Sequence, residues 1–401
     1  MTGGGAGLRR MAVILALLWL VGVTLRLTVL AVPPVIPQIH ADLGIGETGI
    51  GILSSLPMLM FGWAAIPASL LIARIGALPT LVVGLFIAAA AGALRGVSDS
   101  VLVLYAMTVA MSIGIALMQP TLPPLVRRWM PERIGFATAV YSNGWLIGEI
   151  VAVWLTIPYV LPMMHGSWRQ SLMFWSLPVL ATMVLVLLFA PRGPRAAPAA
   201  MSMRRWWPSW NSSLMWRLGL IMGGANIAYW STNAFIPDFL TQAGRPDMIG
   251  STLTILNLGQ LPVSILFLFI AGRLAGRTWP LIALGATMLA GTLTIMFAGG
   301  IWIEVGAAFV GFACAGILIV VLMIPPLIAA AEDVPRMSAG MFMIAYNCSV
   351  VSSVLGGALW DASHSPYPAF GLIALGAAAS VVLPWLGGGL HEHKEAAAAA
   401  G

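Results

Sequence analysis

Two charged side chains lie deep inside long apolar segments of the chain, where charge is rare. Arg26 lies in VTLRLTVL (23–30), and Glu149 lies in NGWLIGEIVAV (143–153). A charged group that faces lipid costs a few kcal/mol, so such residues usually face a bundle interior and bind a solute, carry a proton or pair with one another. A guanidinium is always charged and its planar donors suit carboxylate-like groups. Arg26 therefore indicates a site for a small anion.

The expected depths of Arg26 and Glu149 leave several roles open. If their segments cross the membrane from residues 10 and 135 in the same direction, each charge lies about 14–16 residues along its helix, roughly 21–24 Å at 1.5 Å per residue. The two residues could form a buried ion pair in which each neutralises the other, with no role in substrate binding. Alternatively, Arg26 holds the substrate, and Glu149 is a fixed countercharge or a proton carrier. In a coupled version, the arriving anion displaces Glu149, which takes a proton, so that anion and proton cross together.

Other polar side chains recur at helical spacing in apolar segments. Spacings of three and seven residues place Trp19, Gly22 and Arg26 on one helix face and give Asn226, Tyr229 and Asn233 a face of their own. Each polar group could instead make an interhelical hydrogen bond worth about 1 kcal/mol. The candidate substrate-binding residues are Arg26, Trp19, Gln119, Asn226, Tyr229, Asn233, Tyr346 and Asn347.

The elements that position these residues are membrane helices. The 401-residue chain is 60% hydrophobic and 8% charged, whereas a soluble domain carries roughly 25% charged residues. Apolar segments of about 20 residues have the length of a membrane-crossing helix, and barrel strands would alternate over about 10 residues. We predict an all-α membrane protein with spans near 10–33, 48–72, 78–97, 101–124, 135–160, 170–190, 215–240, 248–271, 279–299, 302–328, 338–360 and 367–386.

The distribution of positive charge predicts the orientation. With both termini inside, fifteen of the 19 basic residues lie on the inner side, while the outer face holds Arg95, Arg169 and Arg245. This bias follows the positive-inside rule, so the net charge of +6 reflects topology and not nucleic-acid binding, with a membrane-surface or partner role as the lesser alternative. We expect a multi-pass protein of a bacterial-type inner membrane with both termini cytoplasmic.

The chain reads as two similar halves. We predict an N-terminal six-helix bundle (1–190), a cytoplasmic linker (191–214) rich in Pro, Ala and Arg, a C-terminal six-helix bundle (215–390) and a cytoplasmic tail (391–401). PPLVRRWMPERIGFATAVYSN (123–143) resembles PPLIAAAEDVPRMSAGMFMIAYNC (325–348), which indicates an internal duplication. Aligning VIPQI with FIPDF places the uncharged Asn226 opposite Arg26.

Prolines are expected to break several of these helices. Pro33, Pro34 and Pro37 should end the first span, and Pro57 and Pro262 should interrupt the second and eighth. Such breaks suit helices that move during transport, although they also occur in static membrane helices.

Neither a metal site nor an enzyme is expected. Cys314 and Cys348 lie in apolar segments and read as packing residues, and we expect no cofactor. The chain lacks a Gly-Lys-Ser/Thr phosphate loop. Its histidines are expected in loops or the tail, at positions 40, 165, 364, 391 and 393.

With its six-plus-six duplication and basic central loop, the chain resembles the major facilitator superfamily of secondary transporters. SLLIARIG (69–76) matches the family's loop motif at Arg74 and Gly76 but has Ala73 in place of its aspartate, and the second half offers GRLAG with Arg273. The resemblance implies that the loops of Arg74 and Arg273 take part in gating. It also implies two pseudo-symmetric bundles, with the first helix of each three-helix unit lining a cavity.

The fifth span resembles the family's antiporter motif. Gly135, Gly144 and Gly148 fit its Gly-x8-Gly-x3-Gly spacing, but Glu149 replaces the proline that should follow. Because small residues four apart let helix backbones approach closely, packing is the favoured role of these glycines.

A looser resemblance narrows the expected substrate. The patterns PPVIPQI (33–39), PPLVRRWMPERIG (123–135) and GSWRQSLMFW (166–175) are similar to the cyanate permease and 2-nitroimidazole transporter group. This implies small anions or small polar heterocycles. Our main expectation is a monomeric secondary transporter of a small anion, with protons as a candidate co-substrate in symport. The alternatives are an exporter of neutral or weakly basic nitroheterocycles and a membrane sensor that does not transport.

Overall fold

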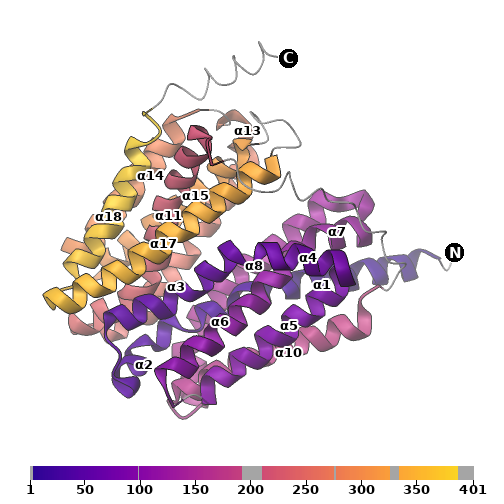
Figure 1. The fold of residues 1–401 in the computed structure, drawn as a ribbon, viewed down its shortest axis with the longest axis horizontal. Coiled ribbons are helices and arrows are strands. Elements are labelled where there is room, and N and C mark those ends of the chain that lie inside the picture. The colour runs from indigo at the N-terminus through magenta and orange to yellow at the C-terminus, as the bar shows by residue number, and fades with distance from the viewer. Residues whose placement is uncertain (1–2, 98, 192–209, 275–276, 326–333, 387–401) are drawn as a thin grey trace. The chain divides into compact units, whose positions relative to one another are not determined.

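The computed structural model describes residues 3–97, 99–191, 210–274, 277–325 and 334–386, and these residues form helices without any β-strand (Figure 1). The predicted tail and most of the predicted linker lie outside this range. In the first half the helices are α1 (Gly3–Leu30), α2 (Ile36–Leu43), α3 (Glu47–Trp63), α4 (Ala65–Ile75), α5 (Ala77–Leu94), α6 (Val101–Met118), α7 (Leu122–Trp129), α8 (Ile134–Leu155), α9 (Leu161–Met163) and α10 (Trp168–Phe189). In the second half they are α11 (Ser213–Gln242), α12 (Ile249–Leu258), α13 (Gln260–Leu274), α14 (Trp279–Phe297), α15 (Ile301–Met323), α17 (Val334–Ser363) and α18 (Tyr367–Val382).

The predicted spans correspond to these helices. The second and eighth each consist of two consecutive helices, α3 with α4 and α12 with α13, and the fourth continues from α6 through Gln119–Thr121 into the start of α7. The other nine each correspond mainly to one helix. Among the described residues, nine segments are long and apolar enough to cross a membrane, and α18 is a shorter apolar helix. The all-α membrane architecture is therefore confirmed.

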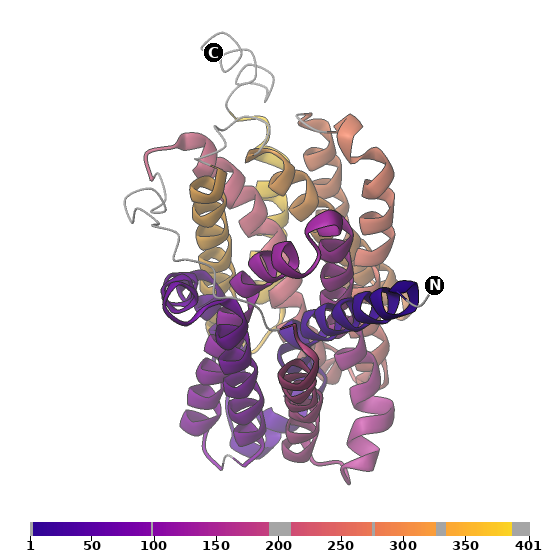
Figure 2. The same ribbon diagram turned by 90° about the vertical axis from the view of Figure 1, so that its right-hand side faces the viewer.

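The helices group into two compact units. One unit comprises Met1–Gly44 and Trp63–Ala200, and the other comprises Ile45–Gly62 and Met201–Gly401. Within each unit the long helices lie side by side, as two views of the ribbon show (Figures 1 and 2). Residues 45–62, which form most of α3, group with the second unit, although the sequence assigns them to the first bundle.

The position of α3 follows from its contacts with α17. The backbone amides of Glu47 and Thr48 each donate to the carboxylate of Asp361 at 2.8 Å. This carboxylate caps the first turn of α3, where backbone N–H groups lack partners inside the helix. One turn further along, a β-carbon on Gly51 would overlap with the carbonyl oxygen of Ser353, so the two backbones are in direct contact.

The two units share one pattern of helix contacts. In the first, α1 packs on α8 and α10, and α5 packs on α6 and α10. In the second, α11 packs on α17 and α18, and α14 packs on α15 and α18. The pattern matches when α1, α5, α6, α8 and α10 are paired with α11, α14, α15, α17 and α18. This repetition supports the internal duplication read from the sequence.

Two prolines account for the paired breaks in the second and eighth spans. A proline lacks an N–H and its ring disturbs the carbonyl four residues earlier. Pro67 lies four residues after Trp63, where α3 ends, and Pro262 lies four residues after Leu258, where α12 ends. The prediction for Pro57 is wrong, because α3 continues through it without a break. Membrane helices tolerate an internal proline when other groups satisfy the released carbonyl.

Prolines also end α1, and the carbonyl that this break leaves without a helical partner is bonded by an arginine. As predicted, the helix stops before Pro33, and the amide of Val32 turns to the carbonyl of Val29 at 3.3 Å. Arg95 donates to the carbonyl of Thr28 at 2.9 Å. Arg95, which the sequence places at the outer end of the third span, is 0% exposed and directed onto the end of α1.

The cysteines and histidines fall mainly where expected. Cys314 and Cys348 are free thiols in helices, and the thiol of Cys314 donates to the carbonyl of Ala225 at 3.3 Å. His165 and His364 occupy turns with positive φ. The loop prediction is wrong for His40, which lies within α2.

Candidate functional site

The candidate site of the first unit is built on an unusually close contact between α1 and α8. A β-carbon on Gly144 would overlap with the carbonyl oxygen of Trp19, and one on Gly148 would overlap with that of Val23. From the other helix, a β-carbon on Gly22 would overlap with the carbonyl oxygen of Tyr141. The packing role predicted for Gly144 and Gly148 is confirmed. The contact fixes the register between the two helices that carry Arg26 and Glu149.

Arg26 and Glu149 form an ion pair inside this unit. Nε of Arg26 lies 3.3 Å from Oε1 of Glu149, and the two residues are 2% and 4% exposed. The equal depth expected from the sequence thus brings them together. A buried pair pays a desolvation cost of several kcal/mol per ion, so its two members depend on each other.

Trp145 completes the pair and is the residue that the sequence reasoning missed. Its ring lies over the guanidinium of Arg26, with the guanidinium carbon 4.1 Å from the ring centroid. Its indole N–H donates to Oε1 of Glu149 at 3.0 Å. Trp145 precedes Glu149 by four residues, the spacing of neighbours on a helix face, and this was the available signal. A desolvated cation–π contact contributes about 2 kcal/mol.

Trp19 lies on the same face of α1 as Arg26. Its indole N–H donates to Oδ1 of Asn143 at 2.9 Å. Trp19, Gly22 and Arg26 therefore all contact α8, as their spacing predicted for a shared face. The aromatic side chain is held in place by the amide of the residue directly before Gly144.

The second unit carries an uncharged polar cluster at the corresponding place, on α11. The hydroxyl of Tyr229 donates to Oδ1 of Asn257 at 2.6 Å, and the amide of Asn233 donates to the backbone carbonyl of Tyr229 at 2.9 Å. Asn257, on α12, is 1% exposed and was also missed by the sequence reasoning. Its position as one of two amides, with Gln260, within an apolar span was the available signal. The cluster fixes the Tyr229 ring through a side chain of another helix.

Two predicted amides hold buried donors without a partner in the described part of the chain. They are Nδ2 of Asn226 on α11 and Nε2 of Gln119, which follows α6 in the first unit. A buried amide donor without a hydrogen bond costs about 1–3 kcal/mol. A bound solute that supplies the acceptor would remove this cost, so these two donors are candidate ligand contacts.

Tyr346 and Asn347 lie on α17 with different surroundings. The ring of Tyr346 is 8% exposed and packs between Phe342 and Phe61, with centroids 5.9 and 6.1 Å away. The amide of Asn347 donates to the carbonyl of Met343 at 2.7 Å. Tyr346 thus belongs to an aromatic group, whereas Asn347 is engaged within its own helix.

Of the two predicted gating arginines, the structure describes the side chain of one. Arg74 is exposed in the last turn of α4, and Gly76 follows with a φ of 95°. A cation near a helix C-terminus interacts favourably with the helix dipole. The side chain of Arg273 lies outside the described residues.

Relatives of known sequence are transporters. The chain is 26% identical over 348 residues to the uncharacterized transporter YycB of Bacillus subtilis, covering 85% of each protein. It is 25% identical to the cyanate transport protein CynX of Escherichia coli, covering 72% of this chain and 73% of CynX. It is also 25% identical to the 2-nitroimidazole transporter of Escherichia coli, covering 60% of this chain and 61% of that protein.

A solved structure has the same fold. The nucleoside transporter NupG superposes with a TM-score of 0.72 at 13% identity, covering 95% of this chain and 98% of NupG. The family model described as Major Facilitator Superfamily matches residues 18–357, which include most of both halves and the Arg26–Glu149 pair. The chain therefore belongs to the Major Facilitator Superfamily of transporters.

Proposed function

We propose that this transporter moves a small cyanate-, nitrate- or carboxylate-like anion across a bacterial-type inner membrane, as a monomer with both termini cytoplasmic. The observation that carries the proposal is the buried pair of Arg26 and Glu149, 3.3 Å apart and covered by Trp145. A membrane transporter retains buried charge at a considerable cost in free energy, and substrate binding is a common reason. Similarity to a cyanate transport protein supports the same substrate class.

Exchange of partners at Arg26 is the proposed binding step. The guanidinium carries five N–H donors in a fixed plane, and two of them can receive the two oxygens of a carboxylate or nitrate. Trp145 covers one face of that plane, so the anion approaches along its edge. The anion then takes over the countercharge role of Glu149, and no bare cation is left in the apolar interior.

Release of Glu149 provides the proposed link to protons. Once Arg26 is neutralised by the anion, the carboxylate would be a buried charge without its cation. Protonation removes that charge at much lower cost than keeping it ionised in an apolar environment. Anion and proton then move together in symport, and the pair reforms when both leave.

The uncharged polar groups are proposed to orient the solute. Asn226, aligned with Arg26 by the duplication, and Gln119 each hold a buried amide donor that can serve an acceptor atom of the anion. Trp19, Tyr229, Asn233, Tyr346 and Asn347 are the remaining candidate contacts. Alternating access between two conformations is proposed from family membership, with the loops of Arg74 and Arg273 as gates.

Uptake into proteoliposomes tests the proposal. Labelled cyanate, nitrate and acetate should be taken up by the wild type and accelerated by an inward proton gradient. Glu149→Gln should keep anion binding but lose the gradient dependence, because an amide cannot carry the proton. Retention of full gradient dependence in Glu149→Gln would exclude coupling through this residue.

A second candidate substrate is a small neutral nitroheterocycle. In the second unit, the Tyr346 ring with Phe61 and Phe342 offers apolar faces, and the neutral donor of Asn226 suits a nitro oxygen. One relative is a 2-nitroimidazole transporter. Thermal-shift titration separates the two, since an anion should stabilise the wild type but not Arg26→Ala, whereas a neutral heterocycle should stabilise both.

A sensor that binds without transporting is the alternative of another class. Counterflow distinguishes it, because only a carrier exchanges labelled solute outside for unlabelled solute inside. Binding without counterflow would overturn the transport assignment for that solute.

A further inference from the structure

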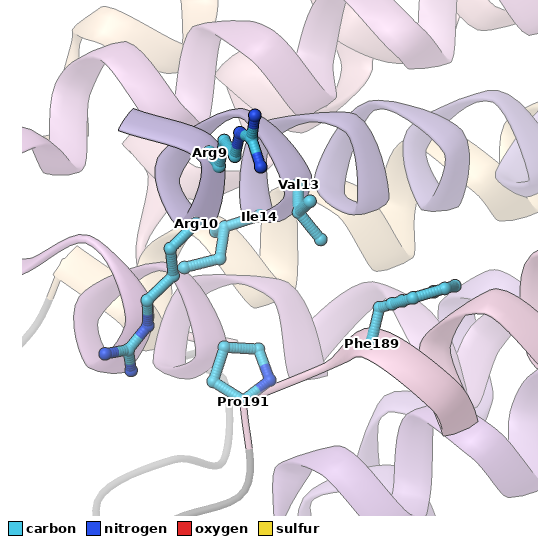
Figure 3. Close-up of a pocket in the computed structure, with 6 residues that line it drawn as sticks. All are labelled: Arg9, Arg10, Val13, Ile14, Phe189 and Pro191. Carbon is cyan, nitrogen blue, oxygen red and sulfur yellow. The ribbon is translucent and has the colours of Figure 1, made fainter. Parts of the chain in front are cut away.

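A groove lies between the N-terminal part of α1 and the C-terminal end of α10, away from the Arg26 site. It has a volume of about 390 Å³ and is lined by Arg9, Arg10, Val13, Ile14, Phe189 and Pro191 (Figure 3). All six residues belong to the first unit. Neither the ion pair nor any gate uses them.

The groove has an apolar wall that is open to its surroundings. Phe189 is 55% exposed and Val13 is 39% exposed, whereas Ile14 is buried beneath them at 4%. Figure 3 shows Val13 and Phe189 on facing sides of the opening. On a membrane helix, an exposed aromatic side chain beside an exposed aliphatic one is a surface for lipid acyl chains.

The end of the groove nearer the N-terminus is basic. Arg9 and Arg10 are both exposed on α1, and Figure 3 shows Arg10 extending past Pro191 while Arg9 points to the other side of the helix. A third guanidinium lies at this end of α1, because Nη1 of Arg133 is 3.7 Å from the sulfur of Met11, the residue after Arg10. Exposed guanidiniums at the end of an apolar span place their charge at the headgroup level of the bilayer.

We propose that this groove binds an anionic phospholipid. The phosphate contacts Arg10, Arg9 adds positive charge at the same end of α1 from the other side of the helix, and one acyl chain lies between Val13 and Phe189. A basic pocket beside membrane helices on the cytoplasmic side has the chemistry that binds anionic headgroups. The apolar wall continuous with the arginines distinguishes this site from a binding site for free phosphate.

Lipid titration of the purified full-length chain tests the proposal. The midpoint of thermal unfolding in detergent is measured against added phosphatidylglycerol, phosphatidylcholine and water-soluble glycerol phosphate. Phosphatidylglycerol should raise the midpoint in a saturable way, and the other two should not. Equal effects of phosphatidylglycerol and phosphatidylcholine, or of phosphatidylglycerol and glycerol phosphate, would overturn the site as proposed.

Variants with matched charge locate the effect. Arg10→Gln should weaken phosphatidylglycerol binding about five-fold and Arg9→Gln/Arg10→Gln about 25-fold, given the usual contribution of each arginine near a membrane surface. Arg127→Gln/Arg128→Gln on α7 removes the same charge from another exposed pair and should bind like the wild type. If both double variants bind phosphatidylglycerol more weakly by a similar factor, the lipid is attracted by surface charge in general, and the groove is not its binding site.

One further variant leaves every charge in place. Val13→Trp fills the opening opposite Phe189 and should weaken phosphatidylglycerol binding without altering the basic residues that orient the chain. It also keeps the test valid if the double arginine variant fails to insert. Wild-type affinity in Val13→Trp would overturn the placement of the acyl chain.

Discussion

The indole of Trp145 contacts both members of a buried ion pair, with its ring 4.1 Å from the guanidinium carbon of Arg26 and its N–H donating to Glu149 at 3.0 Å. One side chain therefore stabilises the cation through its face and the anion through its edge. The pair is consequently a three-residue unit in which neither charge depends on the other alone.

Replacing Trp145 with Phe should destabilise the protein measurably. The ring remains over Arg26, but Glu149 loses a hydrogen bond of the kind that contributes about 1.5–3 kcal/mol when one partner is charged. Thermal unfolding in detergent measures the loss. Trp154→Phe is the matched control, because Trp154 lies on the same helix and is 53% exposed. Equal midpoints for the two variants would contradict the role given to the indole N–H.

Removing one charge of the pair should be worse for stability than removing both. Arg26→Leu or Glu149→Leu alone leaves an uncompensated buried charge, which costs about 3–5 kcal/mol. The double variant replaces both charges with apolar groups and should recover most of the stability. Uptake by the double variant is the discriminating measurement. Wild-type uptake would show that the pair is structural and would remove the proposed site.

The close contact of α1 and α8 should not tolerate a methyl group. Gly148→Ala places a β-carbon against the carbonyl oxygen of Val23, and such overpacking typically costs about 1–3 kcal/mol. Gly371→Ala, in α18, meets no atom within 4 Å and should be neutral or slightly stabilising. The difference in unfolding midpoint between the two variants measures the contact. An unchanged midpoint in Gly148→Ala would mean that the helices can separate without cost.

The hydrogen bond from Tyr229 to Asn257 should contribute modestly to the stability of the second unit. Tyr229→Phe removes the hydroxyl and leaves the buried Oδ1 of Asn257 without this hydrogen-bond donor. The expected loss in the free energy of unfolding is about 1 kcal/mol. Tyr367→Phe is the control, since Tyr367 is 52% exposed. If Tyr229 also contacts the solute, the apparent KM for uptake should rise in Tyr229→Phe and not in Tyr367→Phe.

The sequence predicted the helices and offered the ion pair as one of several roles for Arg26 and Glu149, because both follow from the cost of polarity in a membrane. Apolar length identifies a span whatever its neighbours, and two charges at one depth have few other ways to be satisfied. The glycine contact of α8 was likewise predictable, since Gly144 and Gly148 recur four residues apart.

Other features depend on contacts that single-chain patterns do not record. Arg95 reads in the sequence only as a cation at the outer end of a span, and its burial and its hydrogen bond to the carbonyl of Thr28 become visible only in the structure. Trp145 is uncharged and does not stand out in an apolar segment. Its contact with the guanidinium of Arg26 is visible only once α1 is placed against α8. Pro57 and Pro67 look alike in the sequence, yet α3 passes through the first and ends just before the second.

The glycine contact between α1 and α8 has a mechanical consequence. Carbonyl oxygens of Trp19 and Val23 occupy the space where side chains would normally separate two helices. No side chains lie between the two backbones at these positions, so a shift of one helix along its axis would bring backbone atoms into steric overlap. We therefore expect α1 and α8 to move as one rigid body, so that Arg26 and Glu149 are displaced together.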